Sequence, residues 1–163
     1  MSQTRVVATS LVLAASVLTG VGCAGQQLVA DTRLSITSPR SRTTVEVPVT
    51  VRWTMRSPVP GGSYAVFVDR EPIKVGQTVR SVIDASDGAC KADPSCPDAA
   101  YLAAHDVYVT TATDVTIDHV PVLRSDRSNP EHEVTVILLD PHGRRTSESA
   151  WFGDFKVRAG STS

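Results

Sequence analysis

The chain has 163 residues, of which 41% are hydrophobic and 20% charged, and its formal net charge at pH 7 is -1. This length suits one domain and is short for two. The near-neutral balance excludes the basic surface that binding of phosphate backbones requires, so we expect no nucleic-acid partner.

The N-terminus has the pattern of a secretory signal. Arg5 supplies a positive charge and residues 6–18 form an apolar run. The run is too short to span a bilayer comfortably and has the length of a signal-peptide hydrophobic region. The small residues 20–22 then precede Cys23.

These small residues before a cysteine resemble the lipobox of bacterial lipoproteins, although Gly20 stands where leucine is usual in that family. The resemblance implies cleavage before Cys23 and attachment of a diacylglycerol to its sulfur. Residues 1–22 are then a lipoprotein signal peptide and residues 23–33 a lipidated tether. The expected location is extracytoplasmic, anchored to a bacterial membrane through the lipid. The alternative is an ordinary signal peptide cleaved near Gly25.

Residues 45–55 carry the clearest secondary-structure pattern. Every odd position is apolar: Val45, Val47, Val49, Val51, Trp53 and Met55. A strand sends successive side chains to opposite faces, so this segment has one apolar and one largely polar face, whereas a helix would scatter the same residues. No comparable amphipathic helix occurs elsewhere. The pattern therefore predicts a strand whose apolar face is covered by another sheet.

Shorter apolar patterns predict further strands at residues 34–37, 64–69, 78–83, 107–110, 114–120, 133–140 and 151–157. Pro48 favours a sheet edge or a bulge near that position. Residues 133–140 become apolar on both faces, so we expect that strand to be central. Residues 140–143 fit a type I turn, with proline second and glycine fourth. We expect residues 159–163 to be a disordered tail.

Residues 84–106 interrupt the strand pattern and are longer than most connections in compact domains, which is typical of functional or disordered loops. Residues 99–104 favour one or two helical turns with Asp98 as the N-cap, held to the body by Tyr101 and Leu102. The candidate binding residues in or beside this loop are Asp84, Asp87, Asp93, Asp98, Tyr101, Asp106 and Tyr108.

The cysteine count supports a bridge inside this loop. Three cysteines would leave one free thiol in a secreted protein, and assigning Cys23 to the lipid leaves Cys90 and Cys96. In an oxidising compartment we expect these two to form a local disulfide that stiffens the loop. Zinc is the competing interpretation, but two cysteines without a nearby histidine provide at most half of a site.

Two blocks of the sequence resemble fibronectin type III and immunoglobulin-like modules. Residues 49–54, with Trp53 among them, resemble the second strand of a fibronectin type III domain, and residues 64–66 resemble the third. Residues 116–121 and 132–143 resemble the fifth strand, its connection and the sixth strand.

This resemblance implies an all-β fold for residues 34–158, namely a single Ig-like (fibronectin type III-like) antiparallel β-sandwich with a long disulfide-bearing loop. Three departures are visible. His132 stands about where the family has a corner tyrosine, and the region between Asp69 and Val107 is longer than usual. The spacing of the loop cysteines does not match the inter-sheet disulfide of antibody domains.

The sequence carries no G-x-S-x-G, no H-E-x-x-H and no glycine-rich phosphate loop, so we expect no enzymatic activity and no cofactor. Four histidines are spread over the chain: His105, His119, His132 and His142. A Ser-His-Asp set assembled in space would make the protein a hydrolase of envelope polymers, and this stays a third hypothesis.

The residue pattern argues against metal-binding and sugar-binding sites more than for them. The loop aspartates offer oxygens for calcium, but their spacing matches no EF-hand and aspartate is also a common turn residue. In a strand, Glu131 and Glu133 face away from His132, which argues against a shared metal site. We expect Trp53 and Trp151 to lie in the core rather than on a carbohydrate-binding face.

The expected function is that of a non-catalytic binding module on a membrane-anchored cell-envelope lipoprotein, which recognises a protein or envelope component through residues 84–106. The alternative from another class is a calcium or small-ligand site formed by the acidic Cys90–Cys96 loop.

Overall fold

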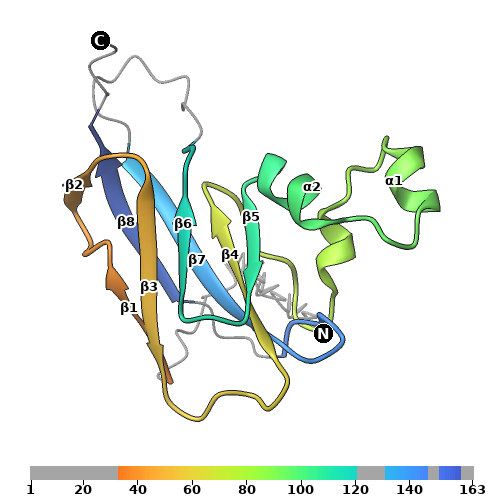
Figure 1. Cartoon of the computed structure of the whole chain (residues 1–163), viewed down its shortest axis with the longest axis horizontal. Coiled ribbons are helices and arrows are strands. Elements are labelled where there is room, and N and C mark those ends of the chain that lie inside the picture. Colours follow the sequence, from red (N-terminus) through yellow and green to blue (C-terminus); the bar gives the residue numbers. More distant parts are fainter. Residues whose placement is uncertain (1–32, 121–130, 147–150, 159–163) are drawn as a thin grey trace, which may run out of the picture.

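Two β-sheets form the body of the protein in the computed structural model, which describes residues 33–120, 131–146 and 151–158, the last range without the side chains of its first two residues. The smaller sheet has the order β1-β3-β6 and consists of β1 (Leu34–Ser38), β3 (Val49–Met55) and β6 (Asp114–Ile117) (Figure 1). The larger sheet has the order β2-β8-β7-β4-β5 and consists of β2 (Thr43–Val45), β8 (Trp151–Val157), β7 (Glu131–Leu139), β4 (Ser63–Val68) and β5 (Val107–Thr110). The predicted all-β character of the body is confirmed by these two sheets.

The strand pairing departs in one place from the expected antiparallel arrangement. β2 pairs with β8 in parallel, whereas the other described pairs are antiparallel. β7 is the middle strand of the larger sheet, as its two apolar faces predicted.

The alternation predicted over residues 45–55 is correct for its second half. Val49, Val51 and Trp53 are buried, while Arg52 between them is exposed. The strand is nevertheless not continuous, because β2 ends in the larger sheet and β3 begins in the smaller one. Val47, between them, is 41% exposed. Proline has no N–H to donate to a sheet ladder, which is why the chain changes sheets at Pro48.

A main core fills the space between the two sheets. It contains Leu34, Val49, Val51, Trp53, Tyr64, Val66, Val68, Ile117, Val120, Val134, Val136, Leu138 and Phe155. Trp53 meets Tyr64 edge to face, with ring centroids 5.2 Å apart. The core position predicted for Trp53 is therefore confirmed, and the contact spans the two sheets.

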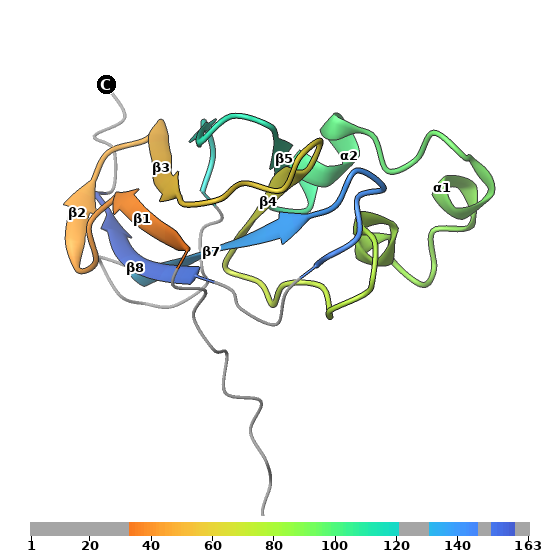
Figure 2. The same cartoon turned by 90° about the horizontal axis from the view of Figure 1, so that it is seen from below.

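A second core lies on the outer face of the larger sheet. There Ala65 and Phe67 of β4 pack with residues from β7 and β5, and the cover comes from Ile73, Val82 and Leu102. These three covering residues all belong to residues 69–106, which form an insertion between the neighbouring strands β4 and β5 (Figure 2). The insertion is thus part of the folded body at its base.

The insertion contains three short helices: η1 (Val79–Val82), α1 (Gly88–Ala92) and α2 (Ala99–Ala104). The strand predicted at residues 78–83 is wrong, because that segment is the 3₁₀ helix η1. Val79 and Val82 are three residues apart, which places both on one side of a 3₁₀ helix and against the second core. The helix predicted at residues 99–104 is confirmed as α2.

Candidate functional site

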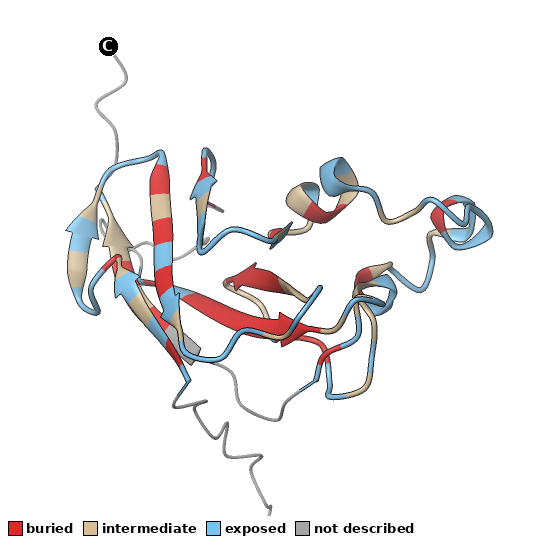
Figure 3. Cartoon of the chain, turned by 60° about the horizontal axis from the view of Figure 1, so that its bottom comes forward, coloured by how far each residue is buried: buried red, intermediate tan, exposed pale blue. Residues whose placement is uncertain are grey.

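The 84–106 loop is the outer part of the insertion. It extends sideways from the two sheets, with α1 farthest from them (Figure 1), and most of its surface is exposed (Figure 3). Leu102 of α2 is 5% exposed and anchors the loop in the second core. The predicted anchoring role of Leu102 is therefore confirmed.

The two loop cysteines lie close together. Their sulfur atoms are at disulfide distance and their Cα atoms are 5.3 Å apart, within the usual range for a bridged pair. Cys90, on α1, is 7% exposed although the residues around it are exposed. Cys96 follows the turn after α1, so the pair is placed to close the tip of the loop.

Arg80 of η1 holds this tip from inside the insertion. Its guanidinium donates hydrogen bonds to the carbonyl oxygens of Lys91 (3.1 Å), Asp93 (3.2 Å), Pro94 (3.4 Å) and Cys96. The last carbonyls of a helix have no partner inside it, so Arg80 supplies donors where α1 ends. The sequence analysis missed this residue, since no local pattern shows that distant carbonyls will gather around one side chain.

The four aspartates of the outer loop are used locally. Asp84 accepts from the N–H and hydroxyl of Ser86, at 2.7 and 2.6 Å, and Asp93 accepts from the same groups of Ser95, at 2.8 and 2.7 Å. The hydroxyl bonds come first among the causes that hold the pKa of both carboxyls below the ordinary value, and the N–H bonds act in the same direction.

The other two aspartates cap helices. Asp87 accepts from the Cys90 N–H at 2.9 Å, and Asp98 accepts from the Tyr101 N–H at 2.7 Å, as predicted for Asp98. In the described part of the chain no three His, Cys, Asp or Glu side chains are grouped so that they can hold a metal ion. Each of these carboxylates therefore shapes its own turn instead of facing a shared centre.

The two candidate tyrosines differ in position. Tyr101 is half-buried and stacks on His105, with ring centroids 4.2 Å apart, and its hydroxyl accepts from the Asp84 N–H at 3.3 Å. Tyr108 lies on β5 and packs against the main core. Burial raises the pKa of the Tyr108 phenol, and the Asp106 and Asp118 carboxylates add to this rise. Tyr101 thus belongs to the loop and Tyr108 to the body.

The insertion leaves and re-enters the sheet at a pair of aspartates, Asp69 and Asp106, which we call the neck. Both have left-handed backbone conformations, with φ of 51° and 59°, which aspartate tolerates better than most residues. The Val68 N–H donates to the Asp106 carbonyl at 3.0 Å, and the Asp69 N–H donates to the Glu133 carbonyl at 2.9 Å. The neck is therefore tied to β4 itself and to its neighbour β7.

The Asp69 carboxylate also forms hydrogen bonds with β7, the strand that carries His132. One oxygen lies 2.6 Å from Nδ1 of His132, and the other accepts from the Glu133 N–H at 2.8 Å. His132 is 2% exposed, whereas Glu131 and Glu133 are exposed, so the predicted opposite faces are confirmed. His132 thus pairs with a residue of the neck.

The environment of Asp106 favours its neutral form. Burial raises the pKa of the Asp106 carboxyl, and the Asp69 carboxylate raises it further. Arg70, His119 and His105 oppose this change without reversing it.

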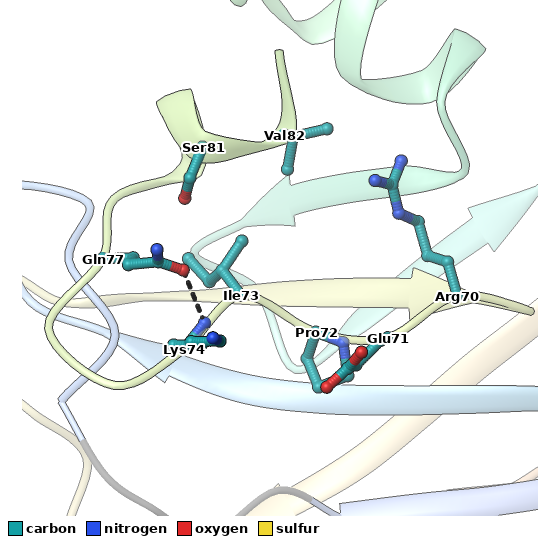
Figure 4. Close-up of a pocket in the computed structure, with 8 residues that line it drawn as sticks. All are labelled: Arg70, Glu71, Pro72, Ile73, Lys74, Gln77, Ser81 and Val82. Carbon is teal, nitrogen blue, oxygen red and sulfur yellow. Dashed lines mark hydrogen bonds between the residues drawn. The ribbon is translucent and has the colours of Figure 1, made fainter. Parts of the chain in front are cut away.

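A small pocket of about 160 Å³ lies beside the neck, between the turn after β4 and η1. Its lining residues are Arg70, Glu71, Pro72, Ile73, Lys74, Gln77, Ser81 and Val82 (Figure 4). The Lys74 N–H donates to Oε1 of Gln77 at 2.9 Å, which closes the turn on one side. None of these residues belongs to the 84–106 loop, so the sequence analysis did not single them out.

No protein-family model, curated protein or solved structure matches the chain. None of the helices in the described ranges is long and apolar enough to cross a membrane. The predictions for residues 1–22, for Cys23, for residues 159–163 and for the side chain of Trp151 lie outside what the structure describes.

Proposed function

We propose that the protein is a lipid-anchored, extracytoplasmic lipoprotein of the bacterial cell envelope. Its Ig-like module would be a non-catalytic binding module that recognises a protein or envelope component through the 84–106 loop. The N-terminal pattern that ends at Cys23 supports the anchor and the location.

The observation that carries the binding role is the fixed shape of an exposed loop. Arg80 gathers the carbonyls at the end of α1, aspartates cap both helices, and Leu102 anchors the base. A disulfide between Cys90 and Cys96 would add a covalent constraint at the tip. Exposed recognition segments on a rigid scaffold bind with a smaller loss of conformational entropy, which is the physical advantage of this arrangement.

Crosslinked pull-down from intact cells tests this proposal. The comparison is between the full chain, a deletion of residues 89–97, and the substitutions Arg80→Ala and Arg56→Ala. Arg56 is exposed just after β3 and its side chain makes none of the loop contacts. We expect the deletion to lose the captured partners, Arg80→Ala to recover less of them and Arg56→Ala to recover them fully. Equal recovery by all four proteins would contradict a binding role for the loop.

The anchor is tested separately. We expect the full chain to fractionate with membranes and Cys23→Ala to remain outside the membrane fraction, with mass spectrometry finding acyl groups on residue 23. An unmodified thiol at that position in the native host would remove the anchor while leaving the binding role open to its own experiment.

A further inference from the structure

The pocket beside the neck has a different character from the exposed loop, and the proposed function does not use it. Its volume of about 160 Å³ is large enough for several water molecules, so it accommodates a ligand of a few heavy atoms. It lies on the segment that enters the insertion, where the described chain is tied to the second core.

One side of the pocket is apolar. Ile73 is 7% exposed, Val82 is 5% exposed, and Pro72 is buried next to them. Ile73 and Val82 are both members of the second core, so the core holds this wall in place. Such a wall favours the hydrocarbon part of a ligand.

Two cations also line the pocket, one at each end of it. Nη1 of Arg70 donates to the His105 carbonyl at 2.6 Å, which fixes the guanidinium and leaves its remaining N–H donors for a ligand. Lys74 is exposed at the opposite end of the lining. Within the described ranges, neither cation forms an ion pair with a carboxylate.

The acidic residue of the lining does not neutralise both cations. Arg70 extends toward the side on which η1 lies, whereas Glu71 extends to the opposite side of the same segment (Figure 4). Among the lining residues, two cations against one carboxylate leave a single net positive charge. Arg70 presents a planar fork of donors that matches a carboxylate.

We propose that this pocket binds a small aliphatic carboxylate, with its charged end on the Arg70 guanidinium and its hydrocarbon part against Ile73 and Val82. This site lies before the 84–106 loop in the chain and does not depend on the loop's having a partner. It adds a small-molecule site to a module proposed to bind a macromolecule.

A titration of the ¹⁵N-labelled full chain with butyrate tests the site by amide chemical shifts. Butyramide serves as the uncharged probe of the same shape, and inorganic phosphate serves as the anion without a hydrocarbon part. We expect butyrate to shift the amides of Ile73, Lys74, Gln77 and Val82 along a saturable curve. Butyramide and phosphate should leave these amides much less changed.

Three substitutions sharpen the result. We expect Arg70→Gln to weaken butyrate binding most, because it removes the group that holds the carboxylate, and Lys74→Gln to weaken it by up to about fivefold, because a positive charge of the lining is lost. Glu71→Gln should strengthen binding, because it removes the opposing charge. Arg56→Gln, at an exposed position outside the lining, should leave the titration unchanged. Lys74 is exposed and Glu71 is exposed, so both variants are expected to fold even if Arg70→Gln does not.

Two kinds of result would overturn the proposal. One is a set of shifts that grows linearly with butyrate and spreads over exposed cations across the molecule. The other is a saturable response that butyramide or phosphate reproduces, or that Lys74→Gln and Glu71→Gln leave unchanged.

Discussion

Thr135 offers a direct test of how the larger sheet is packed. It lies on the central strand β7 and is 1% exposed, and its hydroxyl oxygen has no hydrogen-bond partner in the described part of the protein. Burying an unpaired hydroxyl costs about 1–3 kcal/mol by mutational measurements. Valine keeps the β-branched shape that suits a strand and replaces the hydroxyl by a methyl group.

We therefore expect Thr135→Val to raise the free energy of unfolding by about 1–2 kcal/mol, which corresponds to an increase in Tm of about 3–8 °C for a domain of this size. Urea unfolding followed by circular dichroism measures the change, and the midpoint should rise with an unchanged m value.

Thr54→Val is the matched control for this substitution. Thr54 is an exposed threonine on β3, so the same chemical change there should alter stability by no more than about 0.5 kcal/mol. If Thr135→Val is neutral or destabilising while Thr54→Val behaves as expected, the Thr135 hydroxyl has a partner and the reasoning is refuted.

Three further outcomes follow from the insertion. Because the pKa of Asp106 is raised in the folded protein, its contribution to stability is present at low pH and is lost as pH rises through the folded pKa. We expect Asp106→Asn to have a higher Tm than wild type at pH 7, with the difference shrinking toward pH 4; a constant difference would contradict this. Arg80→Ala should remove about 1 kcal/mol of local stability and so speed amide exchange in residues 90–97 by about fivefold, without changing the free energy of global unfolding. The control Arg56→Ala should leave this exchange unchanged. Adding millimolar calcium to a dialysed sample should leave Tm unchanged, since each aspartate of the outer loop serves its own turn; a clear rise would instead support a calcium site in the loop.

Some elements were predictable because their signal is local. The alternation around Trp53 reports the two faces of β3, and the two apolar faces of β7 predict a strand that is covered on both sides. The helix α2 was found from Asp98 because a capping side chain acts within one turn of the chain. The segment of η1 was misread since Val79 and Val82 fit a short strand nearly as well as a 3₁₀ helix, and four residues are too few to separate the two periods.

The candidate site was likewise only partly predictable from the sequence. The sequence places acidic residues and a cysteine pair in the 84–106 loop, but it does not show that Arg80 gathers the carbonyls of that loop. It shows the face of His132 but not its partner Asp69, which is distant in the sequence. The pocket was equally hidden, because its apolar wall depends on the packing of the second core.

By itself, the sequence determined the all-β character of the body, the position of Trp53 in its core, the break at residues 84–106 and the N-cap of α2, because hydrophobic periodicity and capping act over a few neighbouring residues. Only the tertiary structure decided that the chain changes sheets at Pro48, that the insertion builds a second core, and that Arg80 and Asp69 find their partners. Those outcomes depend on which strands pair and on which side chains compete for buried space, and these choices are made between segments far apart in the chain.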